Sequence, residues 1–117
     1  MVTLYGIRNC DTCRRAMRWL DEAGLDWQFH DLRRDGLDRA RVDAWAEAVG
    51  TDALVNRRGQ TWRRLDPQAR DTLSEDALRD LLVREPTLVK RPVTELPDGR
   101  VHVGWTDVIR EALQGTS

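Results

Sequence analysis

The stretch Val2-Thr3-Leu4-Tyr5-Gly6-Ile7-Arg8-Asn9-Cys10-Asp11-Thr12-Cys13 decides the fold class of this chain. Its first five residues are largely β-branched or apolar and predict a short strand. A turn follows, and from Asp11 to about Ala23 apolar residues recur at helical spacing until Gly24 ends the helix. Two cysteines three residues apart therefore lie where a strand passes into a helix.

The position of Cys10 favours a reactive thiolate. A cysteine attacks as the thiolate, and a free cysteine is mostly protonated at neutral pH. The helix N-terminus directs unpaired backbone N–H groups at Cys10, while Arg8, Arg14 and Arg15 add positive charge nearby. We therefore expect a lowered pKa for Cys10, the nucleophile. Cys13, one helical turn onward, is either a resolving thiol or a small core residue.

Three further strands and one helix complete the two ends of the chain. Residues 26–32 alternate polar and apolar, and predict a second strand, parallel to the first, with Trp27 and Phe29 on one face. Segments 92–96 and 100–103 flank a Pro-Asp-Gly turn and predict a hairpin. A last helix, capped by Thr106 or Asp107, should point these residues inward: Val108, Ile109, Ala112 and Leu113.

The middle of the chain is predicted to be helical. Asp38 can cap a helix that runs to about Val49, and Ser74 can cap another. Between them, Trp62 lies in a short helical segment that should end at Asp66-Pro67. The resulting order is βαβ, helices, ββα. This order predicts an α/β thioredoxin-like fold with a helical insertion at about residues 36–88, all in a single domain over residues 1–117.

Composition narrows the class of protein. A net charge of −1 argues against general binding of nucleic acid or membrane surfaces. No apolar run approaches the ~20 residues that span a bilayer, and the N-terminus lacks a signal-peptide pattern, so we place the protein in the cytoplasm, as a monomer. A cysteine pair there suits catalysis, redox sensing or metal binding better than a structural disulfide. No metal is expected, because His30 and His102 are not at ligand spacing with each other.

Lys90-Arg91-Pro92 is the second signal of function. In a thioredoxin fold the proline that begins the third core strand is usually cis and packs beside the active cysteine. Such a bond would turn Arg91 toward Cys10, where it could hold a thiolate, an oxyanion or a glutathione carboxylate. We assign catalysis to Cys10, Cys13 and Arg91. We assign substrate contacts to Asn9, Asp11, Thr12, Arg57, Arg58, Trp62 and Pro92.

Several motifs resemble those of the arsenate reductase-related ArsC/Spx/YffB family, and the YffB branch most of all. They are residues 5–13, 29–31, 35–37, 56–63 and 90–92, and the similarity extends from Val2 to about Leu113. The resemblance implies a thioredoxin-like fold, one essential cysteine (Cys10), and an arginine before a cis proline (Arg91 before Pro92).

The family implies three alternative functions. YffB-like members are considered glutathione-dependent thiol reductases, with glutathione as co-substrate and no bound cofactor, and this is the leading hypothesis. Glutaredoxin-coupled arsenate reductases hold the oxyanion with three arginines, but Asn56 and Gly104 stand at two of these positions, where Arg57, Arg58 or Arg100 could substitute. Spx-like members use a Cys-x-x-Cys as a redox switch and bind the RNA polymerase α-subunit.

Overall fold

The computed structural model describes residues 1–115, which divide into two compact units. The first unit holds residues 1–35 and 91–115, and the second holds residues 36–90. In the described residues, no helix combines the length and the apolar character needed to cross a membrane. The first unit contains β1 (Val2–Gly6), α1 (Asp11–Glu22), β2 (Trp27–Asp31), β3 (Val93–Glu95), β4 (Val101–Val103) and α6 (Asp107–Gln114).

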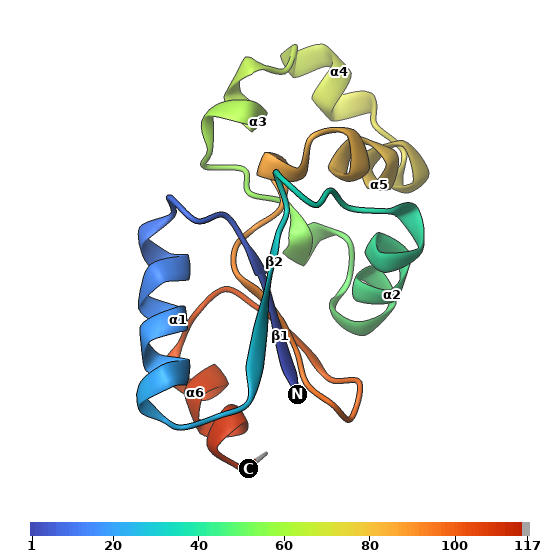
Figure 1. Ribbon diagram of the computed structural model, residues 1–117. Coiled ribbons are helices and arrows are strands. Elements are labelled where there is room, and N and C mark those ends of the chain that lie inside the picture. The colour runs from blue at the N-terminus through green and yellow to red at the C-terminus, as the bar shows by residue number, and fades with distance from the viewer. Residues whose placement is uncertain (116–117) are drawn as a thin grey trace. The chain divides into compact units, whose positions relative to one another are not determined.

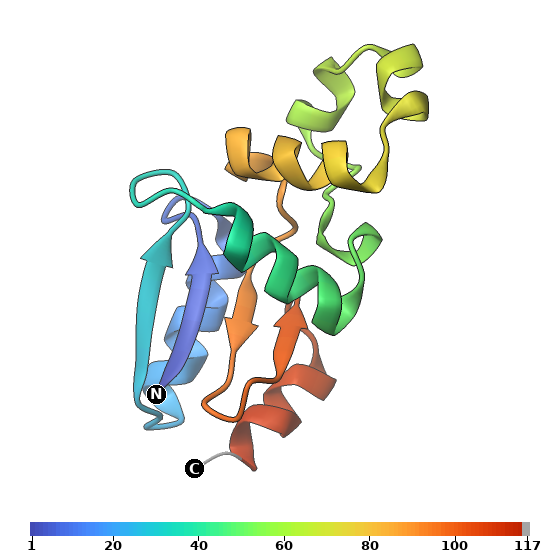
Figure 2. The same ribbon diagram turned by 90° about the vertical axis from the view of Figure 1, so that its right-hand side faces the viewer.

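A four-stranded sheet in the order β2-β1-β3-β4 forms the frame of the first unit. β1 runs parallel to β2 and antiparallel to β3, and β3 runs antiparallel to β4. Helices α1 and α6 both lie against one face of this sheet (Figures 1 and 2). The predicted βαβ and ββα halves are therefore confirmed, and with them the thioredoxin-like fold class.

The core of the first unit lies between this face of the sheet and the two helices. On α6, Ile109 and Leu113 are buried, and Thr106 caps the helix by accepting a hydrogen bond from the Ile109 amide. The prediction that Val108 points inward is wrong, because its side chain is 71% exposed. The buried residues of this core are Val2, Leu4, Ala16, Leu20, Leu96, Ile109 and Leu113.

The second unit is helical. Trp45 is fully buried on its first helix, which Asp38 caps as predicted. The helical segment with Trp62 ends before Asp66-Pro67, as predicted, but Asp66 also caps a further helix that was not predicted, whose first residue is Pro67. Proline suits that position, since the first helical N–H has no partner within the helix. The elements are α2 (Arg39–Val49), η1 (Asp52–Leu54), α3 (Gln60–Arg64), α4 (Pro67–Thr72), α5 (Glu75–Arg84) and η2 (Pro86–Leu88).

Two polar side-chain atoms of the sheet are buried without a hydrogen-bond partner. Thr94 on β3 is fully buried, and His102 lies directly opposite it on β4. The Thr94 Oγ1 and His102 Nε2 atoms have no hydrogen-bond partner within residues 1–115. A buried hydroxyl in that state costs about 1–3 kcal/mol relative to a satisfied one.

We predict that Thr94→Val raises the free energy of unfolding by about 1–2 kcal/mol, because it removes an unsatisfied hydroxyl and keeps the shape of the side chain. Thr51→Val is the matched control, since Thr51 is also buried but donates to Glu75 and accepts from Arg79. That control should be destabilised. Urea unfolding of both variants measures the effect, and a destabilised Thr94→Val would contradict it.

Candidate active site

Cys10 lies at the junction between β1 and α1, as the sequence predicts. It is the N-cap residue of α1, with φ −105° and ψ 122°, and its carbonyl accepts the Arg14 amide at 2.9 Å. Its own amide donates to the Ile7 carbonyl at 3.2 Å, which fixes the turn before the helix. The residue is partly exposed, so that its sulfur can be reached from solvent.

Arg91 and Pro92 immediately precede β3, and Arg91 lies near Cys10. The Arg91–Pro92 peptide bond is cis, as predicted, and Pro92 is buried. The Arg91 guanidinium lies close enough to the Cys10 sulfur to lower the pKa of that thiol. The structure thus brings together three of the predicted residues, Cys10, Arg91 and Pro92, within the first unit.

Cys10 has a lowered pKa. Its partial burial acts in the opposite direction and raises the pKa, but three groups together outweigh that effect. They are the Cys13 backbone amide, the Cys13 thiol and the Arg91 guanidinium. The predicted thiolate character of Cys10 therefore has a local cause, namely hydrogen bonds and one cation at its sulfur.

The cations near Cys10 in the sequence lie elsewhere in the structure. Arg8 faces Asp31 at 3.9 Å and its guanidinium lies over the Phe29 ring. Arg14 donates to the Arg8 carbonyl, and Arg15 donates to Thr12. We expected Arg8, Arg14 and Arg15 to lower the pKa of Cys10, but Arg91 is the cation that does so. The other three arginines contact nearer groups instead of the Cys10 sulfur.

Cys13 occupies a different environment from Cys10, although both belong to one motif. It is fully buried on the inner face of α1, against Gly6 of β1. Burial raises the pKa of Cys13 to about 12, and the neighbouring Cys10 sulfur adds to the rise. At neutral pH Cys13 is therefore a protonated thiol that can donate a hydrogen bond to Cys10.

Gly6 is a site residue that the sequence analysis did not single out. A Cβ atom at this position would lie 2.6 Å from the Cys13 Sγ, which is closer than two such atoms can approach. Glycine inside a strand often marks such a close approach, and this signal was available in the sequence. Because Gly6 has no side chain, the Cys13 sulfur can pack against the backbone of β1.

The other predicted substrate-contact residues of the first unit lie in the loop before α1 and in the first turn of that helix. Asn9 is exposed, Asp11 pairs with Arg14 at 3.6 Å, and the Thr12 hydroxyl accepts from Arg15. These residues adjoin Cys10 in the chain. Their contact with a substrate stays a prediction.

Arg57, Arg58 and Trp62 belong to the second unit. The Arg57 guanidinium pairs with Asp52 at 3.1 Å and lies 5.2 Å from the centroid of the Trp62 ring, while Arg70 lies over the same ring at 5.5 Å. Arg58 is exposed. Their part in the site stays a prediction.

Asn56 and Gly104 stand where arsenate reductases of the family have arginines, and the structure explains why position 104 is a glycine. Gly104 has a φ of +87°, which favours glycine, and its amide donates to the Pro92 carbonyl at 2.8 Å. Arg100 does not take its place, because Arg100 pairs with Asp98 at the hairpin turn, at the other end of β4. At the other position, the Asn56 side chain accepts the Arg58 amide within the second unit.

Comparison with known proteins agrees with this geometry. A family model described as the ArsC family matches residues 5–111. An uncharacterized protein of Haemophilus influenzae is 40% identical over 107 residues, covering 92% of this chain and 93% of that protein. The global transcriptional regulator Spx of Lactiplantibacillus plantarum is 31% identical, covering 97% and 86%. The structure of a YffB protein is 38% identical, covers 96% and 97%, and has a TM-score of 0.89.

We predict that Gly6→Ala destabilises the protein by about 1–3 kcal/mol, because the new methyl group overpacks the space of the Cys13 sulfur. In a Cys13→Ala background the same change should be neutral or stabilising, since the sulfur is gone and alanine suits a strand better than glycine. Thermal and urea unfolding of the four proteins form a double-mutant cycle. Equal effects in both backgrounds would contradict the contact.

We predict that alkylation of Cys10 by iodoacetamide follows a titration whose midpoint is below that of a free cysteine, about 8.5. Lower pH protonates the sulfur and slows the reaction. Arg91→Gln removes the cation at the sulfur and should shift the midpoint upward. Arg14→Gln is the control and should leave it in place, since Arg14 pairs with Asp11. Equal shifts in both variants would refute the role of Arg91.

Proposed function

Because the chain belongs to the ArsC family, we propose that it is a thiol–disulfide oxidoreductase that draws its electrons from glutathione, with Cys10 as the nucleophile. One observation carries this proposal: Cys10 is partly exposed and has a lowered pKa beside Arg91, whereas Cys13 is fully buried and has a raised pKa. One attacking thiolate and one protonated neighbour suit a reaction in which an external thiol completes the cycle.

The first step is attack on an oxidised substrate. The Cys10 thiolate attacks the glutathione sulfur of a mixed disulfide between glutathione and a substrate thiol. A new S–S bond forms between Cys10 and glutathione, and the old S–S bond breaks, so that the substrate leaves as a thiolate and takes a proton from water. The substrate sulfur is reduced, and Cys10 is oxidised to the mixed disulfide.

The second step regenerates Cys10. A second glutathione, as its thiolate, attacks the glutathione sulfur of that mixed disulfide. The products are glutathione disulfide and the Cys10 thiolate, which is a good leaving group because its pKa is lowered. Two glutathione sulfurs are joined for each substrate reduced, and the electrons balance. A cytoplasmic location would supply the glutathione pool that this step needs.

Arg91 has two roles in this scheme. Its guanidinium stabilises the Cys10 thiolate before attack and after release. A guanidinium also presents several N–H donors in a planar fork that suits carboxylates, so we propose that Arg91 also binds a carboxylate of glutathione. The same side chain would then hold the co-substrate next to the sulfur that it attacks.

Arsenate reduction has less support. Three family arginines hold the oxyanion, and this chain has Asn56 and Gly104 at two of those positions. Each charge-assisted hydrogen bond that is lost costs about 1.5–3 kcal/mol. Addition of arsenate with glutathione and glutaredoxin should therefore give no arsenate-dependent oxidation of NADPH in a coupled assay.

A regulatory role is the second candidate, because the chain shares 31% identity with a transcriptional regulator and has the second cysteine of the motif. In that case a Cys10–Cys13 disulfide would change the affinity for a partner such as the RNA polymerase α-subunit. Binding of that subunit to the reduced and the oxidised protein distinguishes the two functions. Turnover without binding supports the reductase.

We predict that Cys10→Ser abolishes glutathione-dependent reduction of hydroxyethyl disulfide in an assay coupled to glutathione reductase. Cys13→Ser should retain activity within about threefold, since its hydroxyl can still donate to Cys10 and glutathione, not Cys13, completes the cycle. Mass spectrometry should show one glutathione on Cys13→Ser and none on Cys10→Ser. Full activity of Cys10→Ser would refute the proposal, and loss of turnover in Cys13→Ser would indicate a dithiol route.

A further inference from the structure

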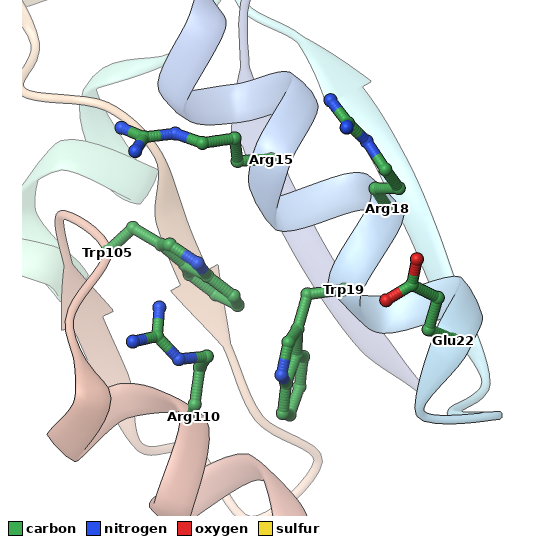
Figure 3. Close-up of a pocket in the computed structure, with 6 residues that line it drawn as sticks. All are labelled: Arg15, Arg18, Trp19, Glu22, Trp105 and Arg110. Carbon is green, nitrogen blue, oxygen red and sulfur yellow. The ribbon is translucent and has the colours of Figure 1, made fainter.

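A cleft lies at the seam between α1 and α6 of the first unit, apart from the residues assigned to the active site. Its volume is about 240 Å³. Four of its lining residues come from α1, one from α6, and one from the segment before α6 (Figure 3). They are Arg15, Arg18, Trp19, Glu22, Trp105 and Arg110.

Two tryptophans form the apolar part of the cleft. The rings of Trp19 and Trp105 meet edge to face, with centroids 5.6 Å apart and an interplanar angle of 71°. Both are half-buried and pack against the core of the first unit, so the rings are held in place. A planar aromatic ring can gain both apolar burial and ring contacts on such a surface.

Three arginines line the cleft together with the tryptophans. Figure 3 shows Arg15 and Arg110 on opposite sides of Trp105, with Arg18 on the α1 side of the cleft. Arg110 lies 5.9 Å from the centroid of the Trp105 ring and pairs with Asp107. Arg18 has no ion pair within residues 1–115, and Glu22 is the one acidic lining residue. The cleft therefore carries an excess of positive charge on a chain whose net charge is −1.

The chemistry and the size of the cleft together define a ligand. Guanidinium groups favour phosphate and carboxylate, and the paired indoles favour an aromatic ring. A volume of about 240 Å³ is below the range typical of drug-sized ligands and fits one ring with its anionic group. We propose that this cleft binds a small aromatic anion, with the ring against Trp19 and Trp105 and the phosphate or carboxylate on the arginines.

The experiment uses phenyl phosphate as the probe and the full-length protein. In ¹H–¹⁵N spectra the five tryptophans give five indole N–H signals, which single Trp→Phe variants assign. We expect phenyl phosphate to shift the Trp19 and Trp105 signals in a saturable way, with a Kd of about 1 mM. Phenol has the aromatic ring without the phosphate, and inorganic phosphate has the anion without the ring. Each should bind at least about tenfold more weakly than phenyl phosphate.

Two variants and one internal control complete the test. Arg15→Gln and Arg18→Gln change exposed residues, so the fold should persist while the Kd for phenyl phosphate rises about tenfold in the double variant. Arg33→Gln, another exposed arginine, should have no effect. The Trp62 signal should not move, although Arg57 and Arg70 lie over its ring. The proposal is overturned by the absence of shifts up to about 20 mM, by equal shifts with inorganic phosphate, or by shifts centred on Trp62.

Discussion

The close approach of Cys13 to Gly6 sets the distance between α1 and β1. A Cβ atom at position 6 would lie 2.6 Å from the Cys13 Sγ, which is too close. Glycine at this position therefore allows α1 to pack directly against the backbone of β1. Cys10 caps the same helix, and β3, which begins just after Arg91, pairs with the same strand. The contact between a buried thiol and a glycine therefore also positions the reactive sulfur against its cation.

The two sulfurs of the motif differ because they lie on two sides of one helix end. Cys10 lies outside the first turn, where the Cys13 backbone amide and thiol and the Arg91 guanidinium favour the anion. Cys13 stands inside, where burial favours the neutral thiol. A protonated Cys13 can donate to the Cys10 thiolate, so the burial of one sulfur contributes to the ionisation of the other. The spacing of the motif thus produces an attacking group and a supporting group.

Local patterns in the sequence predicted much of the fold, and long-range contacts account for the errors. Strand alternation, caps at Asp38, Ser74 and Thr106, and the parallel pairing of the first two strands follow from neighbours in the chain. The choice of Arg91 over Arg8, Arg14 and Arg15 as the cation at Cys10 depends on tertiary pairing. The cis proline was expected only through the fold family. Helix α4 was missed because proline can begin a helix as well as end one.

The number of cations at Cys10 bears on the choice of substrate. The backbone at residue 104 has a positive φ and donates to the Pro92 carbonyl, so this place beside the cis proline accommodates glycine and supplies no guanidinium. Arg91 is the cation that acts on the sulfur. One guanidinium has enough N–H donors to contact a thiolate and a single carboxylate, whereas an oxyanion of higher charge needs further donors, each worth about 1.5–3 kcal/mol. The electrostatics of the first unit are therefore an argument for the proposed thiol co-substrate, glutathione, and against an inorganic oxyanion.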